Sequence, residues 1–292
     1  MLKKILVTGS AGFIGSAVAE RLLSLGFHIV GVDNMNNFYD PKLKIDRIKR
    51  IEGHNKKKQN FEFLKLDLRY KKSLVKIFKH GPFEKIIHFA AQAGVRYSIK
   101  NPSAYVNNNI ITFSNLLEAV KDNGGTEHLV YASSSSVYGG NIKLPFTENQ
   151  RVDQPVNIYA ATKKSNELMS FVYSHLYGIP TTGLRLFTVY GPWGRPDMAL
   201  FKFVSSILND EPIDVYNKGE MYRDFTYVDD VVEGIRLLID TIPGFSFKKK
   251  IFENDSLSTA APYRVVNIGN SNTVKVLDFI KVIEEVLSKK AI

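Results

Sequence analysis

The chain of 292 residues contains no cysteine. It therefore has no disulfide, no thiolate metal site and no cysteine nucleophile. The histidines, which are His28, His54, His80, His88, His128 and His175, never fall at the close spacing of metal ligands. We therefore expect no bound metal.

Long hydrophobic runs are also missing. No apolar stretch approaches the roughly 18 residues of a membrane span, and the apolar part of residues 1–10 is too short for a signal peptide. We expect a cytoplasmic protein without a membrane segment.

Acidic residues are in the minority, with 29 Asp and Glu against 39 Lys and Arg and a formal net charge of +10. Much of the basic excess lies in three runs, at residues 42–50, 55–59 and 247–251. These runs lack the interleaved aromatic residues that single-strand nucleic-acid binders use. We interpret them as solvated basic surface, expect no nucleic-acid partner, and expect attraction of anionic small molecules.

Short β-rich runs punctuate the chain, with helical segments such as residues 103–124 between several of them. The runs are residues 3–8, 27–33, 61–68, 85–91, 128–135, 181–191 and 263–270. Strands alternating with helices predict right-handed crossovers and a doubly wound, parallel α/β (Rossmann) sheet, with ligands at the carboxyl ends of its strands.

The rhythm changes after Gly191. We expect a main domain over residues 1–191 and a smaller mixed α/β lobe formed mainly by residues 192–292. Residues 264–269 look like a strand that returns to the main sheet, so the two lobes are expected to interlock.

Three glycines, Gly9, Gly12 and Gly15, lie between the first expected strand and the first expected helix. In this context they permit a tight turn, a close approach to a pyrophosphate and close helix–strand packing, with the helix N-terminus facing the negative charge. Asp33 ends the second strand, where a carboxylate accepts from ribose hydroxyls and repels a 2′-phosphate. The pattern predicts a dinucleotide site that prefers NAD to NADP.

Further strand ends fit the same ligand. Asp67 follows the third strand and either reaches the adenine or caps a helix. The small residues in "HFAAQ", residues 88–92, let the chain run close to a cofactor. We interpret His88 as a packed histidine rather than a catalytic one.

Tyr159 and Lys163 are four residues apart in an expected helix and so share a face, either as a catalytic pair or as solvated surface. Ser134 ends a strand upstream, and the two segments can converge over a nicotinamide. A phenol acting as a base near neutral pH needs its pKa lowered by about three units, or about 4 kcal/mol. One cation at about 4 Å supplies about that much. We expect this from Lys163, helped by the positive charge of an oxidised nicotinamide.

The motifs "TGSAGFIG", "YASSSSVYG" and "YAATK" together resemble the extended short-chain dehydrogenase/reductase superfamily, and within it the NAD-dependent nucleotide-sugar epimerases. The resemblance covers nearly the whole chain. It implies a catalytic triad of Ser134, Tyr159 and Lys163. The cofactor contacts that it implies, beside the three glycines, are Phe13, Ile14, Asp33, Asn34, Asp67, Leu68, Ala90, Ala91, Gln92, Asn109, Tyr159 and Lys163.

Three longer stretches, "DNMNNFYDPKLKIDR", "AAQAGVRYSIKNP" and "LRLFTVYGPWGRPDMA", resemble UDP-glucuronate 4-epimerases. That resemblance implies conversion of UDP-glucuronate to UDP-galacturonate through a 4-keto sugar, in polysaccharide biosynthesis. It also implies a sugar-carboxylate site, an arginine on the diphosphate and an aromatic ring beside the uracil, although each residue also has a structural interpretation. The diphosphate arginine is Arg223, and the ring beside the uracil is Tyr216. The residues implied at the sugar-carboxylate site are Arg96, Ser135, Ser136, Thr188 and Arg195.

Several alternatives stay open. One is a 4-epimerase of UDP-glucose or UDP-N-acetylglucosamine. Another is a UDP-glucuronate decarboxylase, which is disfavoured because such enzymes carry an acidic residue just before "VYG". Family members usually continue further at the C-terminus, so a truncated dinucleotide-binding protein without turnover is a third.

The resemblance also implies a homodimer that pairs through residues 103–121 and 157–177. Apolar residues suited to that interface are Ile110, Phe113, Leu117, Leu168, Phe171 and Val172. Packing within one monomer explains the same residues.

Overall fold

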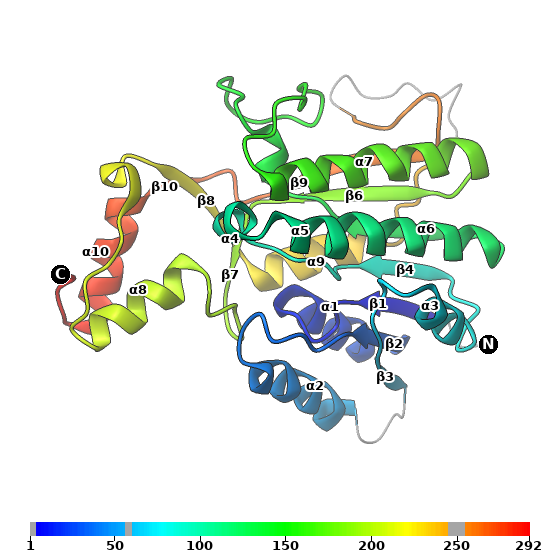
Figure 1. Ribbon diagram of the computed structural model, residues 1–292, viewed down its shortest axis with the longest axis horizontal. Coiled ribbons are helices and arrows are strands. Elements are labelled where there is room, and N and C mark those ends of the chain that lie inside the picture. Colours follow the sequence, from blue (N-terminus) through cyan, green and yellow to red (C-terminus); the bar gives the residue numbers. More distant parts are fainter. Residues whose placement is uncertain (1–3, 56–59, 245–254) are drawn as a thin grey trace.

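The computed structural model describes residues 4–55, 60–244 and 255–292 (Figure 1). Most of the basic run at residues 55–59 and all of the run at 247–251 lie outside this part of the chain. The described residues form a seven-stranded sheet in the order β3-β2-β1-β4-β5-β6-β9. All of its neighbouring strands run parallel. The doubly wound sheet expected from the sequence is confirmed.

The strands are short and buried. They are β1 (Lys4–Thr8), β2 (His28–Asp33), β3 (Phe61–Lys65), β4 (Lys85–His88), β5 (His128–Ala132), β6 (Thr181–Leu186) and β9 (Tyr263–Ile268). Successive side chains point to opposite faces of the sheet. Ile5 and Val7 accordingly belong to one apolar core and Leu6 to the other. Both faces are therefore covered.

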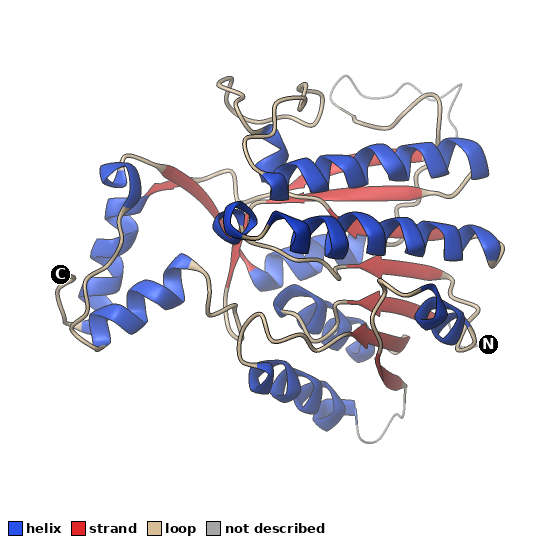
Figure 2. Cartoon of the chain, viewed as in Figure 1, coloured by secondary structure: helices blue, strands red, loops and turns tan. Residues whose placement is uncertain are grey.

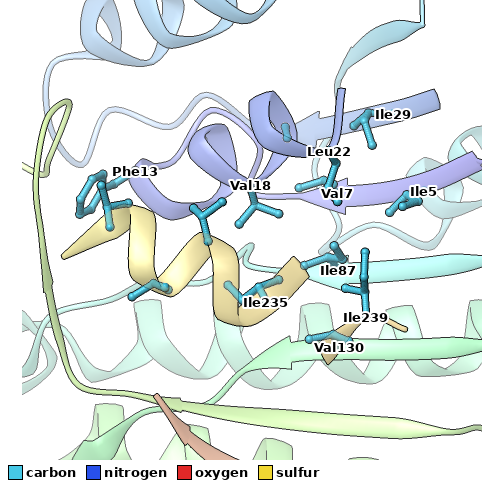
Figure 3. Packing of buried hydrophobic residues seen from close by; sticks show 14 of the residues in the cluster. Ile5, Val7, Phe13, Val18, Leu22, Ile29, Ile87, Val130, Ile235 and Ile239 are labelled. Atoms are coloured by element: carbon cyan, nitrogen blue, oxygen red, sulfur yellow. The ribbon is translucent and has the colours of Figure 1, made fainter. Parts of the chain in front are cut away.

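Helices cover the sheet on each side (Figure 2). The first layer contains α1 (Phe13–Ser24), α2 (Pro41–Asn55) and α9 (Val228–Leu238). The second contains α3 (Lys71–Phe78), α6 (Thr112–Asp122) and α7 (Ile158–Tyr177). Figure 3 shows Val18 and Leu22 of α1 in the same cluster as Ile235 of α9 and Ile239, which follows that helix.

A smaller lobe stands beside the carboxyl ends of the strands (Figure 1, left). Its sheet has the order β10-β8-β7, with β7 (Thr188–Tyr190) parallel to β8 (Tyr222–Tyr227) and β10 (Thr273–Lys275) antiparallel to it. Helices α8 (Ala199–Leu208) and α10 (Val276–Leu287) pack together through an apolar core. That core contains Phe203, Ile207, Val276, Ile280 and Ile283.

The chain moves between the two lobes more often than the sequence indicated. Strand β9 returns to the main sheet beside β6, as expected. Helix α9 also returns and packs on α1, which the expected division at residue 191 did not include. The run at 181–191 is not one strand, because the chain leaves the main sheet at Phe187 and enters the second sheet as β7.

The helix expected over residues 103–124 is also divided. It consists of α5 (Pro102–Tyr105), a π-helical turn η1 (Val106–Ile111) and α6. Two short elements complete the surroundings of the site, α4 (Val95–Lys100) and the 3-10 turn η2 (Ser135–Tyr138).

Within the described residues, no helix combines the length and the apolar character that crossing a bilayer requires. The same part of the chain holds no group of three acidic or histidine side chains close enough to share a metal ion.

Candidate active site

A cavity of about 1590 Å³ opens where the carboxyl ends of the main strands meet the smaller lobe. Its floor lies at β1 and β4, where the strand order reverses, which is the usual ligand position in doubly wound sheets. The loops after β1, β2, β3, β4 and β5 contribute to one side. Phe201, Asp214 and Tyr216 of the smaller lobe contribute to the other.

The glycine-rich loop forms one end of the cavity. Gly9 has a φ of +72°, and a Cβ there would lie 2.7 Å from the backbone nitrogen of Ala90. A Cβ on Gly15 would collide with the carbonyl oxygen of Gly9, so α1 packs onto the loop only with glycine there. Gly12 is the N-cap of α1 and has no side chain to accept from the first-turn N–H groups. Residues 12–15 line the cavity, so the N-terminus of α1 is placed as an anion site requires.

Asp33 lies in the cavity wall beside the glycine loop. Its carboxylate accepts from the backbone nitrogen of Met35 at 2.8 Å and of Ala11 at 3.3 Å. Burial raises its pKa, while the Lys44 ammonium and these N–H groups act in the opposite direction. Asn34 lines the cavity as well and donates to the Asp67 carboxylate at 3.4 Å.

Asp67 reaches the cavity rather than capping a helix. The N-cap of α3 is Tyr70, so the N-cap interpretation of Asp67 is wrong. Its carboxylate is held by Arg69, whose Nη2 lies 2.7 Å away. Leu68, Ala90, Ala91 and Gln92 also line the cavity.

Asn109 supports the cavity wall from behind and does not line the cavity. Its Oδ1 accepts from the backbone nitrogen of Gln92 at 2.7 Å. Its Nδ2 donates to the carbonyl of Gln92 at 3.0 Å and to Thr162 at 2.9 Å. Asn109, which was expected to contact the cofactor, thus fixes the backbone at Gln92.

Ser134, Tyr159 and Lys163 all line this cavity. Ser134 follows β5, and α7 carries the other two. Lys163 donates from Nζ to the Ala132 carbonyl at 2.8 Å. Burial lowers the pKa of Lys163 to about 8.

The Lys163 ammonium donates to a backbone carbonyl, and other groups lower the pKa of the Tyr159 phenol. Burial raises the pKa of Tyr159, and the influences that lower it are a hydrogen bond with Ser134 and the charge of Arg195. The sequence argument placed the cation of Lys163 against the phenol, but its ammonium is held by the carbonyl of Ala132 instead. An oxidised nicotinamide would add a further positive charge beside the phenol.

His88 is a packed residue, as interpreted from the sequence. Its Nδ1 lies 2.7 Å from the hydroxyl of Thr8, and its ring contacts Phe113. Burial, with the nearby charge of Lys163, lowers its pKa to about 3. A ring with this pKa stays neutral near pH 7.

Arg195 lines the same cavity as Ser134, Tyr159 and Lys163. Its Nε donates to Asp197 Oδ1 at 3.0 Å, and its Nη2 donates to Asp197 Oδ2 at 2.5 Å. Nη2 also donates to the Ala93 carbonyl at 3.2 Å. Thr188, Ser135 and Ser136 line the same space. The two bonds to Asp197 thus fix the orientation of the Arg195 guanidinium.

Arg96 and Tyr216 line the cavity and contact each other. The guanidinium carbon of Arg96 lies 3.4 Å from the centroid of the Tyr216 ring. Arg96 therefore covers one face of the ring expected beside a uracil. Arg223 lies outside the large cavity and lines an adjacent pocket of about 160 Å³, which Tyr216 shares.

The sequence analysis missed Lys44 and Asp197, which line the cavity, and the buried Arg47, which does not. Lys44 and Arg47 were interpreted as solvated surface, but their side chains are 5% and 0% exposed. Lys44 and Arg47 precede the buried Ile48 and Ile51 by four residues each, which places them on the apolar face of α2. A cation on an apolar helix face was the sequence signal that could have indicated their burial. Asp197 had no comparable signal.

Comparisons with known proteins agree with this geometry. Residues 5–247 match the model of the NAD dependent epimerase/dehydratase family. The chain is 51% identical over 288 residues to Protein CapI of Staphylococcus aureus, covering 99% of this chain and 84% of that protein. It is 47% identical over 291 residues to a probable UDP-glucuronate 4-epimerase of Rhizobium meliloti, with the same two coverages.

A solved structure is similar over the same extent. It is the UDP-glucuronic acid 4-epimerase of Bacillus cereus in complex with UDP-glucuronic acid and NAD. The TM-score is 0.83 at 34% identity, and the match covers 99% of this chain and 84% of that one.

Proposed function

Because the chain belongs to the NAD-dependent epimerase/dehydratase family, we propose that it is an isomerase that inverts C4′ of UDP-glucuronate to give UDP-galacturonate. The observation that carries this proposal is one cavity that holds Ser134, Tyr159 and Lys163 together with Thr188 and Arg195. The first three residues suit proton transfer at a sugar hydroxyl. The other two suit a carboxylate on the same sugar.

The residues present fit NAD. The loop packs so closely on the backbone of Ala90 that only glycine fits at Gly9, and the N-terminus of α1 lines the cavity where a pyrophosphate would lie. Asp33 accepts two backbone N–H bonds and keeps lone pairs for ribose hydroxyls. When bound, NAD supplies a reversible hydride acceptor and donor.

Cofactor preference follows from Asp33. A 2′-phosphate would lie against this carboxylate, so we expect NAD to bind at least about tenfold more tightly than NADP, which corresponds to about 1.4 kcal/mol. Asp33→Asn should reduce the ratio of NAD affinity to NADP affinity, because it removes the negative charge and keeps the shape of the side chain. Calorimetric titration of both proteins with both cofactors measures it. Equal affinities in the unchanged protein would contradict the assignment.

The protein's own groups handle the proton. Tyr159, as phenolate, accepts the proton of the sugar 4′-hydroxyl while C4′ is oxidised, and the phenol returns it when the 4-ketone is reduced on its other face. Ser134 hydrogen-bonds the phenol and lowers its pKa. The Ala132 carbonyl accepts from the Lys163 ammonium and so holds it at the end of β5.

The sugar carboxylate needs restraint, because a 4-keto glucuronate is a β-keto acid that can lose carbon dioxide. Arg195 presents a planar guanidinium, which suits a carboxylate. Residues 133–136 are all serine, so no acid stands before "VYG" to act at C5. Both features favour epimerisation over decarboxylation.

Arg195 also acts on the pH dependence. Burial raises the pKa of Tyr159, and the charge of Arg195 lowers it. Arg195→Met removes the second influence, so the pKa rises and less phenolate forms at a given pH. We expect the ascending limb of kcat against pH to move to higher pH. A lower kcat with an unmoved limb would contradict this role.

Substrate choice tests the proposed function. We expect kcat/KM for UDP-glucuronate to exceed the values for UDP-glucose and UDP-N-acetylglucosamine, because the latter two leave Arg195 without a carboxylate. Arg195→Met should remove most of this preference. If a neutral sugar reacted faster with the unchanged protein, the carboxylate pocket would be wrong, while the fold and the role of Tyr159 would stand.

We also propose that the protein is a homodimer that pairs through α7. Leu168, Val172 and Leu176 repeat every four residues on this helix and are 58%, 47% and 62% exposed. Such a stripe forms one apolar face. Phe113 and Leu117, expected at the interface, are buried in the monomer core instead.

Light scattering at micromolar concentration should therefore give the mass of two chains. Leu168→Glu combined with Val172→Glu should give the mass of one chain, because two charges would be buried at the interface. A monomeric mass for the unchanged protein would count against the dimer.

A further inference from the structure

Arg47 of α2 is completely buried, and its exposed fraction is 0%. It lies where the segment after β7 passes beside α2 (Figure 1). Burying a guanidinium is costly unless its donors are satisfied. The acceptors of the Arg47 guanidinium must therefore offset the cost of burying it.

Every N–H of the guanidinium has an acceptor. Nε and Nη2 donate to the Trp193 carbonyl at 3.1 and 2.6 Å, and Nη2 also donates to the Gly194 carbonyl at 3.1 Å. Nη1 donates to the Ala11 carbonyl at 3.0 Å and to the Tyr39 hydroxyl at 2.7 Å. All four acceptor groups are uncharged. Arg47 therefore makes the five bonds that an arginine can make without a carboxylate partner.

The acceptors belong to two parts of the site that are far apart in sequence. Ala11 lies inside the glycine-rich loop between Gly9 and Gly12. Trp193 and Gly194 immediately precede Arg195, the guanidinium of the sugar side. One buried side chain thus joins the backbone of the cofactor loop to the backbone of the loop that presents Arg195.

The joined loop is strained where Arg47 holds it. Trp193 has a φ of +61°, an unfavourable conformation for a bulky residue that persists only where its surroundings enforce it. Arg47 binds its carbonyl twice, and the guanidinium of Arg50 lies 5.0 Å from the centroid of its ring. A Cβ on Gly194 would lie 2.5 Å from the Phe201 ring, so the turn has little room to shift.

We propose that Arg47 is a positioning residue that holds the Trp193–Arg195 turn in register with the glycine-rich loop, so that cofactor and sugar meet Arg195 in one fixed geometry. It touches neither the reacting atoms nor the cavity itself. The part of this inference that concerns the sugar rests on the proposed function. The part that concerns the two loops does not.

Arg47→Lys is the informative variant, because lysine keeps the charge but has no planar fork of five donors. Trp193 is the only tryptophan of the chain, so its emission, excited where tyrosine and NAD do not absorb, reports directly on the turn. We expect a shifted emission spectrum and NAD binding weakened by about tenfold. Lys49→Met, which removes an exposed charge from the same helix, should change neither reading.

Sugar kinetics then separate positioning from a purely structural role. At saturating NAD, Arg47→Lys should raise KM for UDP-glucuronate about tenfold. In an Arg195→Met background the same change should have almost no further effect on KM, because the two residues act through one contact. A purely structural role would instead lower the folded fraction and leave the KM, the NAD affinity and the Trp193 emission of the folded protein unchanged.

Tyr39→Phe provides a second route if Arg47→Lys does not fold. It removes one acceptor of Nη1 and leaves the guanidinium in place, so a smaller shift of Trp193 emission in the same direction is expected. Unchanged emission and NAD affinity in this variant would overturn the proposal. If UDP-glucuronate proved not to be a substrate, the emission and NAD measurements would still decide the coupling of the two loops.

Discussion

Tyr159→Phe is expected to lower kcat by about 10²–10⁴-fold, the range typical of a lost general acid–base group. The variant lacks only the hydroxyl that accepts and returns the proton of the sugar 4′-OH. The ring keeps its edge-to-face contact with Tyr105, with centroids 6.0 Å apart. NAD affinity should therefore stay within about threefold of the unchanged protein.

Tyr173→Phe is the matched control. Tyr173 lies on the same helix, and its hydroxyl binds Glu118 far from the cavity. This variant should keep its kcat. If Tyr159→Phe retained activity within about tenfold, below the usual acid–base range, another group would have to be the proton acceptor.

The second large effect is expected in stability, at the buried pair of Arg185 and Glu167. Both side chains are 3% exposed, with Nε–Oε1 and Nη2–Oε2 distances of 2.9 and 3.0 Å. Arg185→Met would remove the two-bond partner of this buried carboxylate and leave it only the Ser133 hydroxyl and the Lys164 ammonium, whose Nζ lies 3.4 Å from Oε2. We expect the free energy of unfolding to fall by about 3–5 kcal/mol, as measured by urea denaturation.

This pair also connects the strand end to the catalytic helix. Glu167 lies on α7 one turn after Lys163, and its Oε1 accepts from Ser133, the neighbour of Ser134, at 2.7 Å. Combining Arg185→Met with Glu167→Leu should recover much of the lost stability, because the buried carboxylate is removed together with its guanidinium partner. Arg236→Met, which breaks an exposed pair with Glu233, should have a much smaller effect. A loss for Arg185→Met no larger than for this control would contradict the account.

The fold could be predicted from sequence because its signals are local. Ile5, Val7 and Ile29 lie in short apolar runs whose alternation with helices specifies a parallel sheet. The glycine motif, Asp33 and the Tyr159–Lys163 spacing likewise depend on neighbouring residues. The strands of the main sheet begin within one residue of their expected starts, whereas β3, β4 and β5 end three residues earlier than expected.

Features that depend on distant partners could not be predicted. The π-helical turn at residues 106–111 contains Asn109, whose side chain binds the distant backbone of Gln92. The strand that breaks at Phe187 does so because the smaller lobe supplies a second sheet. In the sequence Lys44 and Arg47 resemble surface cations. Their acceptors, such as the carbonyls of Asn36 and Trp193, are identified only in the folded structure.

The pKa of Tyr159 shows the same limit. Spacing alone placed Lys163 beside the phenol, but the Ala132 carbonyl is the acceptor of its ammonium. The groups that lower the phenol pKa are Ser134 and Arg195, which come from other segments of the chain. Helix periodicity can bring two residues to one face, but it does not specify which atoms they bind.

The most direct test of the central claim uses UDP-glucuronate that carries deuterium at C4′. The protein is incubated with this sugar and NAD, and the products are followed by NMR. We expect UDP-galacturonate that retains deuterium at C4′, without net NADH and with little carbon dioxide, because the hydrogen removed from C4′ returns to the same carbon. Formation of a UDP-pentose with carbon dioxide, or loss of the deuterium to water, would contradict the proposed epimerisation.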